Sequence, residues 1–148
     1  MKVDDAMNSN VHTIRTGTSV RDAAEKLAQT AVADLAVLDD SDNFAGVLSE
    51  GDLLRAVLPS FSDLIERDSL SAGREIFEEA SAEVSAMTID RFMITAPITL
   101  DPKDDITRAA GIMNARYIRR LPVVKDGKLV GSLARGDICR AALARTTG

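Results

Sequence analysis

The sequence has little of several residue types, and each shortage limits what the chain can be. It contains one cysteine, Cys139, so no disulfide can form within the chain, and a reducing compartment, the cytoplasm, is expected. Tryptophan is missing and aromatic residues make up 3% of the chain, so the core has to be built from aliphatic side chains. No run approaches the ~18 apolar residues of a membrane span, and the N-terminus lacks the apolar core of a signal peptide.

Groups that carry out catalysis are equally scarce. The chain has a single histidine, His12, and its position is unrelated to that of Cys139 in the internal alignment given below. The sequence contains no phosphate-binding or dinucleotide-binding glycine motif and no zinc-ligand spacing. Without a nucleophile–base pair, we expect a protein with no enzymatic activity, no metal site and no resident cofactor.

Charge is distributed unevenly along the 148 residues. The net charge is −5, but residues 1–58 and residues 59–88 each carry −5, whereas residues 89–148 carry +5. An anionic ligand should therefore prefer the last segment. The alternative is that the basic segment only complements the acidic ones when they pack together.

The strongest feature of the sequence is an internal repeat of about 50 residues. Aligning Met7 with Met93, with one extra residue in a turn of the first copy, brings identical residues together along both copies. The shared residues include Ala-Ala pairs, single glycines and Gly-Asp pairs: Ala23-Ala24 and Ala109-Ala110, Gly46 and Gly131, Gly51-Asp52 and Gly136-Asp137. One such copy cannot bury both faces of its sheet, so the two are predicted to fold together about a pseudo-twofold axis.

Each copy predicts the same order of elements, β-α-β-β-α. A short extended segment precedes a helix, which begins after the N-cap residue Ser19 in copy one and after Asp105 in copy two. Apolar residues of that helix recur at i, i+3, i+4 and i+7. Two apolar runs then flank a short polar turn, which is typical of a hairpin, and a second helix follows. The predicted fold class is α/β (α+β), with repeats at 1–58 and 89–148.

Residues 59–88 separate the copies and are predicted to form a helical insert. Pro59 is expected to end the preceding helix. A narrow apolar stripe predicts a further helix over 71–86. The stripe consists of Ile76, Phe77, Ala80 and Val84. We expect this helix to cap the module or to support dimerisation, and a specialised partner-binding arm is the alternative.

The two copies resemble the cystathionine-β-synthase-like (CBS) domain, and the tandem pair resembles a Bateman module. One basis is the hydrophobic-Pro-Val segment Leu121-Pro122-Val123-Val124. The other is the family's Gly-x-x-Thr/Ser-x-x-Asp signature, which copy one carries completely from Gly46 to Asp52. Copy two carries it from Gly131 to Asp137, but Ala134 stands where a hydroxyl residue is expected.

This resemblance implies a regulatory module that binds an adenosine-containing ligand (AMP, ADP, ATP or S-adenosylmethionine) and that forms a homodimer. In such modules the signature acid binds the ribose hydroxyls, and the Ser or Thr contacts ribose or phosphate. The first extended segment holds adenine, and basic residues before the Leu-Pro-Val strand meet phosphate. In this chain these roles fall on Asp52, Ser49, Asn10, Val11 and His12 in copy one, and on Asp137, Thr95, Ala96, Pro97, Ile98, Arg119, Arg120 and Pro122 in copy two.

The assigned acids also have a purely structural interpretation. Ser49 and Asp52 together match a capping box for the second helix of copy one. Asp137 lies in the first turn of the corresponding helix, where a carboxylate gains from the helix dipole. A lone histidine such as His12 is more often a surface residue than a ligand.

The basic residues distinguish the two copies. Arg119 and Arg120 suit bidentate phosphate binding, although adjacent arginines also occur at solvated strand ends. Copy one has Ala33 and Asp34 at these positions, where a carboxylate repels phosphate. We therefore expect an anionic adenosyl ligand to choose the cleft made mainly by copy two, with its ribose on Asp137.

The function predicted from the sequence is that of a stand-alone regulatory module. It would bind an adenosyl ligand and adjust a partner protein, not identified by the sequence, through its conformation or oligomeric state. A structural dimerisation module with vestigial clefts is the second hypothesis. A nucleic-acid-binding module is the third, and the acidic pI of 4.9 and the scarcity of aromatic residues argue against it.

Overall fold

The computed structural model describes residues 1–65 and 70–145, apart from the side chains of 58–65, 70–73 and 76. The chain divides into two compact units. One unit contains Met1–Val11, Ser41–Phe44 and the chain from Ala96 onward, and thus most of the second repeat. The other contains His12–Asp40 and Ala45–Thr95, and thus most of the first repeat together with the insert.

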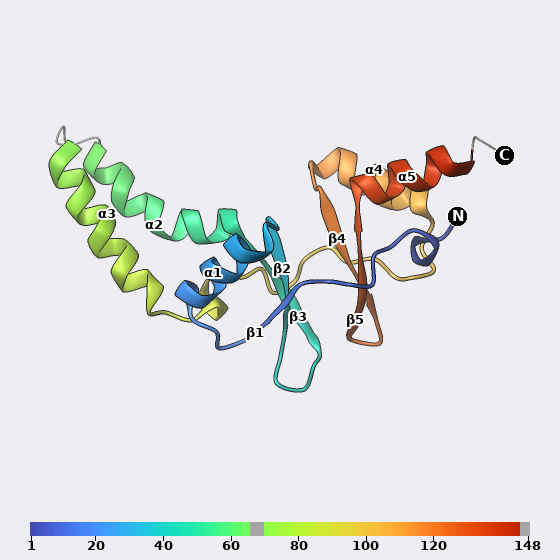
Figure 1. Cartoon of the computed structure of the whole chain (residues 1–148), viewed down its shortest axis with the longest axis horizontal. Helices are drawn as coiled ribbons and strands as arrows, with labels where there is room; N and C mark the ends of the chain where they lie inside the picture. The colour runs from blue at the N-terminus through green and yellow to red at the C-terminus, as the bar shows by residue number, and fades with distance from the viewer. Residues whose placement is uncertain (66–69, 146–148) are drawn as a thin grey trace. The chain divides into compact units, whose positions relative to one another are not determined.

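The unit of the first repeat is built on a three-stranded sheet. The strands are β1 (Thr13–Arg15), β2 (Asp34–Leu38) and β3 (Phe44–Ser49), in the order β1-β2-β3. β1 runs parallel to β2, with Thr13 opposite Ala36. The helices, shown in Figure 1, are α1 (Val20–Thr30), α2 (Glu50–Ile65) and α3 (Leu70–Ser85), followed by the short 3₁₀ helix η2 (Ile89–Arg91).

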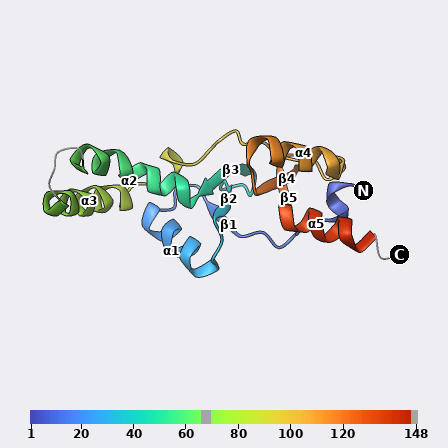
Figure 2. The same cartoon turned by 90° about the horizontal axis from the view of Figure 1, so that it is seen from above.

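The unit of the second repeat is built on an antiparallel hairpin. Its elements are η1 (Val3–Asp5), α4 (Ile106–Arg116), β4 (Arg120–Lys125), β5 (Lys128–Ala134) and α5 (Arg135–Ala144). In place of a third strand, Leu100 forms a single parallel bridge with Val123. Figure 2 shows α4 and α5 beside the β4–β5 hairpin. The predicted α+β fold of two CBS-like repeats is confirmed.

Local signals in the sequence account for the helix starts and the turn. The Oγ atom of Ser19 accepts a hydrogen bond from the Asp22 amide at 3.1 Å, and Oδ1 of Asp105 accepts one from the Thr107 amide at 2.8 Å. The turn between β4 and β5 has left-handed backbone at both central residues, Asp126 (φ 51°) and Gly127 (φ 76°). Two left-handed residues match the type I′ turn that joins the strands of a tight hairpin.

Each unit has its own aliphatic core. In both cores most buried residues come from the first helix and from the strands of the repeat, and each core includes one residue of a 3₁₀ helix. That residue is Val3 in one unit and Ile89 in the other, and both are 0% exposed. Backbone hydrogen bonds hold the 3₁₀ helices in place, because the Val3 amide donates to the Asp104 carbonyl and the Ile89 amide donates to the Thr18 carbonyl.

The insert differs from the sequence-based prediction in one respect. Pro59 does not end the helix, because α2 continues from Glu50 to Ile65. A proline inside a helix removes one backbone hydrogen bond, but α2 and α3 lie side by side as a helical hairpin (Figures 1 and 2), and tertiary packing overrides the local preference. The helix predicted over 71–86 is present as α3.

The apolar stripe of α3 is only partly covered. Phe77, Ala80 and Val84 are half-buried, and Val84 packs against the core of its unit. The side chain of Ile76, the remaining residue of the predicted stripe, lies outside the described residues.

Candidate ligand-binding site

The signature acid of the first repeat lies at the start of α2. Oδ2 of Asp52 accepts a hydrogen bond from the Ser49 amide at 2.8 Å, and Oγ of Ser49 accepts one from the Asp52 amide at 3.1 Å. This pair completes the capping box. The other carboxylate oxygen, Oδ1, lies 2.6 Å from Nη2 of Arg55. The Asp52 side chain is 6% exposed, whereas that of Arg55 is 69% exposed.

The acid of the second repeat has the same surroundings at the start of α5. Oδ2 of Asp137 accepts a hydrogen bond from the Ala134 amide at 2.8 Å. Oδ1 lies 3.1 Å from Nη2 of Arg140, whose side chain is 74% exposed. Half of the capping box therefore persists where the hydroxyl is missing. In both repeats one carboxylate oxygen holds the helix start, and the other meets an exposed arginine that water already solvates.

The signature glycines are needed because another chain segment crosses each strand at close range. A Cβ atom on Gly46 would lie 2.2 Å from the carbonyl oxygen of Ile94, and one on Gly131 would lie 2.8 Å from Sδ of Met7 and 3.0 Å from the carbonyl oxygen of Asn8. These approaches allow paired backbone hydrogen bonds between Val47 and Ile94 and between Ser132 and Asn8. The glycines thus position a segment near the start of each repeat.

The segments proposed to hold adenine follow directly from these crossings. After Ile94, residues 95, 96 and 98 are exposed and Pro97 is half-buried, until Leu100 bonds to the Pro122 carbonyl of β4 at 2.9 Å. After Asn8, the amide of Asn10 donates to the side-chain oxygen of Asn8 at 2.9 Å. Val11 is half-buried and His12 is exposed. Both segments therefore present exposed side chains.

Two arginines of the second repeat form side-chain hydrogen bonds that the sequence did not indicate. Arg119 is exposed, whereas Arg120 is half-buried and its Nη1 donates to Oγ of Ser132 at 3.2 Å. Arg135 donates through Nε to the Ile118 carbonyl at 2.8 Å and through Nη2 to the Met113 carbonyl at 3.2 Å. It thereby ties the end of α4 to the start of α5.

Sequence reasoning missed both Ser132 and Arg135. The internal alignment carried a signal for each, because their counterparts in the first repeat are Val47 and Glu50, which differ in polarity or charge. A change of chemical character at equivalent repeat positions is therefore a signal that selects candidate residues.

The two units divide the proposed site residues between them. Asp137, Arg119, Arg120 and Pro122 belong to one unit, together with Ala96, Pro97, Ile98, Asn10 and Val11. Ser49 and Asp52 belong to the other unit, together with His12 and Thr95. The ligand contacts assigned to these residues stay predictions.

Within residues 1–65 and 70–145, no group of three or more His, Cys, Asp or Glu residues is placed to hold a metal ion. No helix in the same ranges is both long and apolar enough to cross a bilayer.

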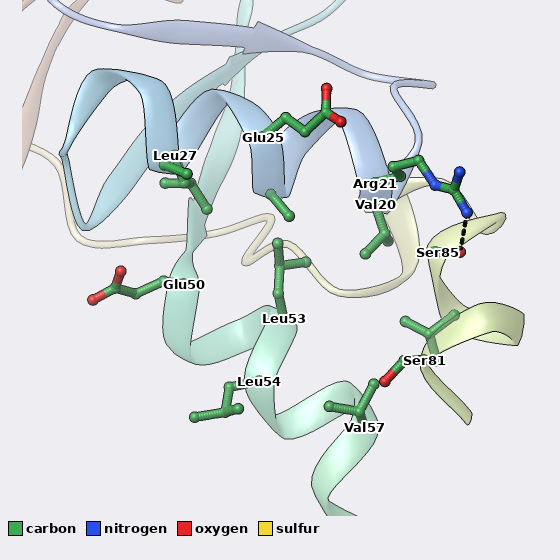
Figure 3. A pocket seen from close by; sticks show the side chains of 13 residues that line it. Val20, Arg21, Glu25, Leu27, Glu50, Leu53, Leu54, Val57, Ser81 and Ser85 are labelled. Carbon is green, nitrogen blue, oxygen red and sulfur yellow. Dashed lines mark hydrogen bonds between the residues drawn. The ribbon is translucent and has the colours of Figure 1, made fainter. Parts of the chain in front are cut away.

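An apolar groove lies on the helical side of the first repeat's unit, between α1, α2 and α3 (Figure 3). Its volume is about 570 Å³. Val20 and Leu27 of α1 and Leu53 of α2 point toward one another in the groove. At its edge Leu54 is 55% exposed, and on α3 Ser85 accepts a hydrogen bond from Arg21 at 3.4 Å.

Two positions on the helices of the repeats are more exposed than their apolar counterparts suggest. Cys139, which aligns with Leu54, is exposed on α5. Ala24, one of the predicted apolar positions of α1, is also exposed and lines the groove. α1 and α2 therefore carry apolar residues, Ala24 and Leu54, that their own unit does not bury.

Comparison with known proteins agrees with the repeat. The sequence profile of the family described as "CBS domain" matches residues 3–59 and 88–144. The chain is 34% identical over 143 residues to the chloroplastic CBS domain-containing protein CBSX2 of Arabidopsis thaliana, covering 90% of this chain and 59% of that protein. It is 32% identical over 119 residues to the uncharacterized protein MJ1426 of Methanocaldococcus jannaschii, covering 72% of this chain and 71% of that protein.

Solved structures of CBS pairs share the fold. Arabidopsis thaliana CBSX2 superimposes with a TM-score of 0.78 at 31% identity, covering 99% of this chain and 97% of the crystallised one. A structure of CBSX2 in complex with AMP gives a TM-score of 0.74 at 32% identity, covering 98% of both chains. The chain spans about three fifths of the full length of the CBSX2 protein. With two repeats matched in sequence and in structure, the chain belongs to the CBS domain family, as a tandem pair of CBS domains.

Proposed function

We propose that this CBS pair is a Bateman-type regulatory module. It binds a phosphate-bearing adenosyl ligand and adjusts a partner protein through its conformation or oligomeric state. The main support is the similar setting of Asp52 and Asp137, each with one carboxylate oxygen on a backbone amide and the other against an exposed arginine. Further support is that CBSX2, 32% identical over nearly the whole of this chain, was crystallised with AMP.

The carboxylates are suited to a ribose. In this proposal the ribose hydroxyls donate to Oδ1 of Asp137 and displace Arg140, whose ion pair is mostly exposed and therefore weak. Oδ2 stays on the Ala134 amide, so the helix start is preserved. Ligand binding and helix capping then use different oxygens of one side chain.

Phosphate recognition distinguishes the second repeat. Arg119 and Arg120 lie at the start of β4, and guanidinium groups bind phosphate through paired hydrogen bonds. The equivalent residues of the first repeat, Ala33 and Asp34, offer no positive charge. The proposed activity is binding without chemical conversion, and the chain's sole histidine and cysteine are His12 and Cys139. We place the protein in the cytoplasm because this cysteine is a free thiol.

Isothermal titration calorimetry of the full chain tests the proposal. AMP, ADP, ATP, S-adenosylmethionine and NAD are titrated in turn, with adenosine as the uncharged reference. At least one of the adenosyl ligands should bind, and Asp137→Ala should weaken binding of AMP, ATP and adenosine about tenfold to a hundredfold, since a hydrogen bond to a charged group is worth roughly 1.5–3 kcal/mol.

Two further variants separate ligand binding from helix capping. Asp137→Asn keeps an acceptor for the Ala134 amide but removes the charge, so it should lose ligand affinity while keeping its melting temperature. Asp52→Ala serves as the matched variant in the first repeat. If Asp52→Ala abolishes nucleotide binding and Asp137→Ala has no effect, the cleft is wrongly assigned, and if no adenosyl ligand binds at all, the proposal fails.

The groove favours a second function, homodimerisation. Leu54 and Ala24 expose apolar surface at its edge, while its lining carries both charges, Arg21 and Glu25 on α1 and Glu50 on α2. We propose that a second copy of this chain covers the groove, since twofold dimers use self-complementary surfaces. Leu54→Glu should then convert a dimer into a monomer in sedimentation equilibrium at micromolar concentration. Tyr117→Gly, at an exposed residue outside the groove, is the control, and a monomeric wild-type chain would refute this assignment.

A further inference from the structure

Arg120 is fixed by a buried hydroxyl on the neighbouring strand. Its Nη1 lies 3.2 Å from Oγ of Ser132, which is 2% exposed. Ser132 itself cannot shift easily, because its backbone amide and carbonyl each form a 2.8 Å hydrogen bond with Asn8. The serine therefore holds one end of the guanidinium at a set place beside β5.

The arginine and the serine occur together in one repeat and are both missing from the other. The first repeat has Asp34 in place of Arg120 and Val47 in place of Ser132. Val47 forms the same paired backbone hydrogen bonds as Ser132, in its case with Ile94, so the backbone role is common to both repeats. The hydroxyl is the part that the second repeat adds.

A valine at position 132 could form the same backbone hydrogen bonds, so these bonds do not explain why a hydroxyl is present. Burying a hydroxyl is costly unless it forms a hydrogen bond. Here its partner is the guanidinium of Arg120. A guanidinium that is already held near its binding geometry loses less side-chain freedom when it meets an anion, so such a bond raises the affinity for anions.

We propose that Ser132 is a positioning residue for Arg120, and that the Arg120–Ser132 pair makes the second repeat prefer phosphate-bearing adenosyl ligands over adenosine. The inference rests on the proposed ligand-binding function and specifies how its phosphate subsite is built. Arg120 contacts the phosphate, whereas Ser132 acts only through Arg120.

The test compares AMP with adenosine by calorimetry on the full chain. Ser132→Val, which installs the residue of the first repeat, and Ser132→Ala should each lower AMP affinity about three- to tenfold, the range expected for one hydrogen bond, and should change adenosine affinity less than twofold. Ser132→Thr keeps the hydroxyl and should restore AMP affinity. In a double-mutant cycle, adding Ser132→Ala to Arg120→Ala should cause no further loss.

The outcomes are distinguishable. Equal losses for AMP and adenosine in Ser132→Ala would mean that the serine has a structural role only. An additive effect in the double mutant would show that it acts independently of Arg120. Either result, or an unchanged ratio of AMP to adenosine affinity, overturns this inference and leaves the proposed function in place. If the wild-type chain binds neither ligand, the inference fails, and the proposed function fails with it only if the other adenosyl ligands do not bind either.

A gain-of-function experiment keeps the inference testable even if the Ser132 variants fold poorly. In an Arg120→Ala background, Asp34→Arg combined with Val47→Ser should restore a preference for AMP by building the pair in the first repeat. Asp34→Arg alone is the matched control and should restore less. If the single and double variants bind AMP equally well, the hydroxyl contributes nothing and the inference is overturned.

Discussion

Oδ2 of Asp137 lies 2.8 Å from the backbone nitrogen of Ala134, the same distance that separates Oδ2 of Asp52 from the nitrogen of Ser49. The two helices therefore begin in the same way, although only Ser49 has the hydroxyl that completes a capping box. The signature acid has a structural role that does not depend on its hydroxyl partner. In the proposed function the ligand therefore uses the second carboxylate oxygen, which meets Arg140 or Arg55.

Completing the box in the second repeat should stabilise the protein. Ala134→Ser adds an acceptor for the Asp137 amide, and the free energy of unfolding should rise by about 1 kcal/mol. Ser49→Ala, the reverse change in the first repeat, should lower it by a similar amount. Urea unfolding measures both. If Ser49→Ala leaves the stability unchanged, the box contributes nothing to the stability of α2.

The two signature glycines should tolerate alanine to different degrees. In Gly46→Ala the new Cβ meets the backbone oxygen of Ile94 at 2.2 Å, whereas in Gly131→Ala its nearest contact, at 2.8 Å, is the flexible side chain of Met7. Backbone moves less readily than a methionine side chain, so Gly46→Ala should be the more destabilising, with losses of about 1–3 kcal/mol for such overpacking.

Gly111 supplies the matched control for these variants. It lies within α4, and a Cβ atom there would have nothing within 4 Å. Gly111→Ala should therefore stabilise the protein by about 0.5–1 kcal/mol through helix propensity. Thermal and urea unfolding of the three variants give the ranking, and a Gly46→Ala variant as stable as the wild type would contradict the close approach.

Tyr117 should be improved by glycine. It follows α4 with a left-handed backbone, at φ 56°, and its side chain is 88% exposed. The left-handed conformation costs a non-glycine residue roughly 1–2 kcal/mol, and the exposed ring makes little packing to compensate. Tyr117→Gly should raise the free energy of unfolding by about 1 kcal/mol in urea. A loss of stability would mean that the ring contributes a contact in solution.

Asp105 should make stability depend on pH in the acid range. Hydrogen bonds from the Thr107 hydroxyl, at 2.6 Å, and from the Thr107 amide, at 2.8 Å, hold the pKa of this carboxyl below its usual 3.8. Because the folded pKa lies below the unfolded one, the stabilisation is complete above the unfolded value and is lost as the pH falls through the folded value.

The measurement compares the wild type with Asp105→Asn, which keeps a capping oxygen but does not titrate. Urea unfolding from pH 6 to pH 2 should show a difference in stability between the two proteins that is constant near neutral pH and shrinks below pH 4. Thr107→Val should bring the pKa of Asp105 closer to 3.8 in an NMR titration. A difference that stays constant down to pH 2 would refute the assigned cause.

Much of the fold could be predicted because its signals are local. Ser19 and Asp105 mark helix starts within three residues of the amides that they accept from, and Asp126 and Gly127 mark a turn by their own backbone preferences. Because most of these patterns occur in both copies, a weak pattern in one copy was supported by the equivalent pattern in the other. Pro59 was misread because a local penalty was outweighed by the packing of α3 on α2.

The candidate site could be outlined only in part. Asp52 and Asp137 belong to a short signature, and Arg119 and Arg120 precede a recognisable strand, so the sequence sufficed to select them as candidates, and their ligand contacts stay predictions. Ser132 was missed because its partner, Arg120, lies on the opposite strand of the hairpin, twelve positions away. The sequence alone assigns no role to a serine in an apolar strand, because only the pairing of β4 with β5 places an arginine beside it.

The sequence by itself determined the two repeats, their order of elements and the residues that distinguish one repeat from the other, since these depend on neighbouring residues and on comparison of two copies. Only the tertiary structure decided which apolar faces are covered. A periodic pattern shows that Val20, Ala24 and Leu27 share one side of a helix, but not how much of that side the sheet can reach. Ala24 and Leu54 therefore remain exposed at the groove, because each helix presents a wider apolar surface than its own unit buries.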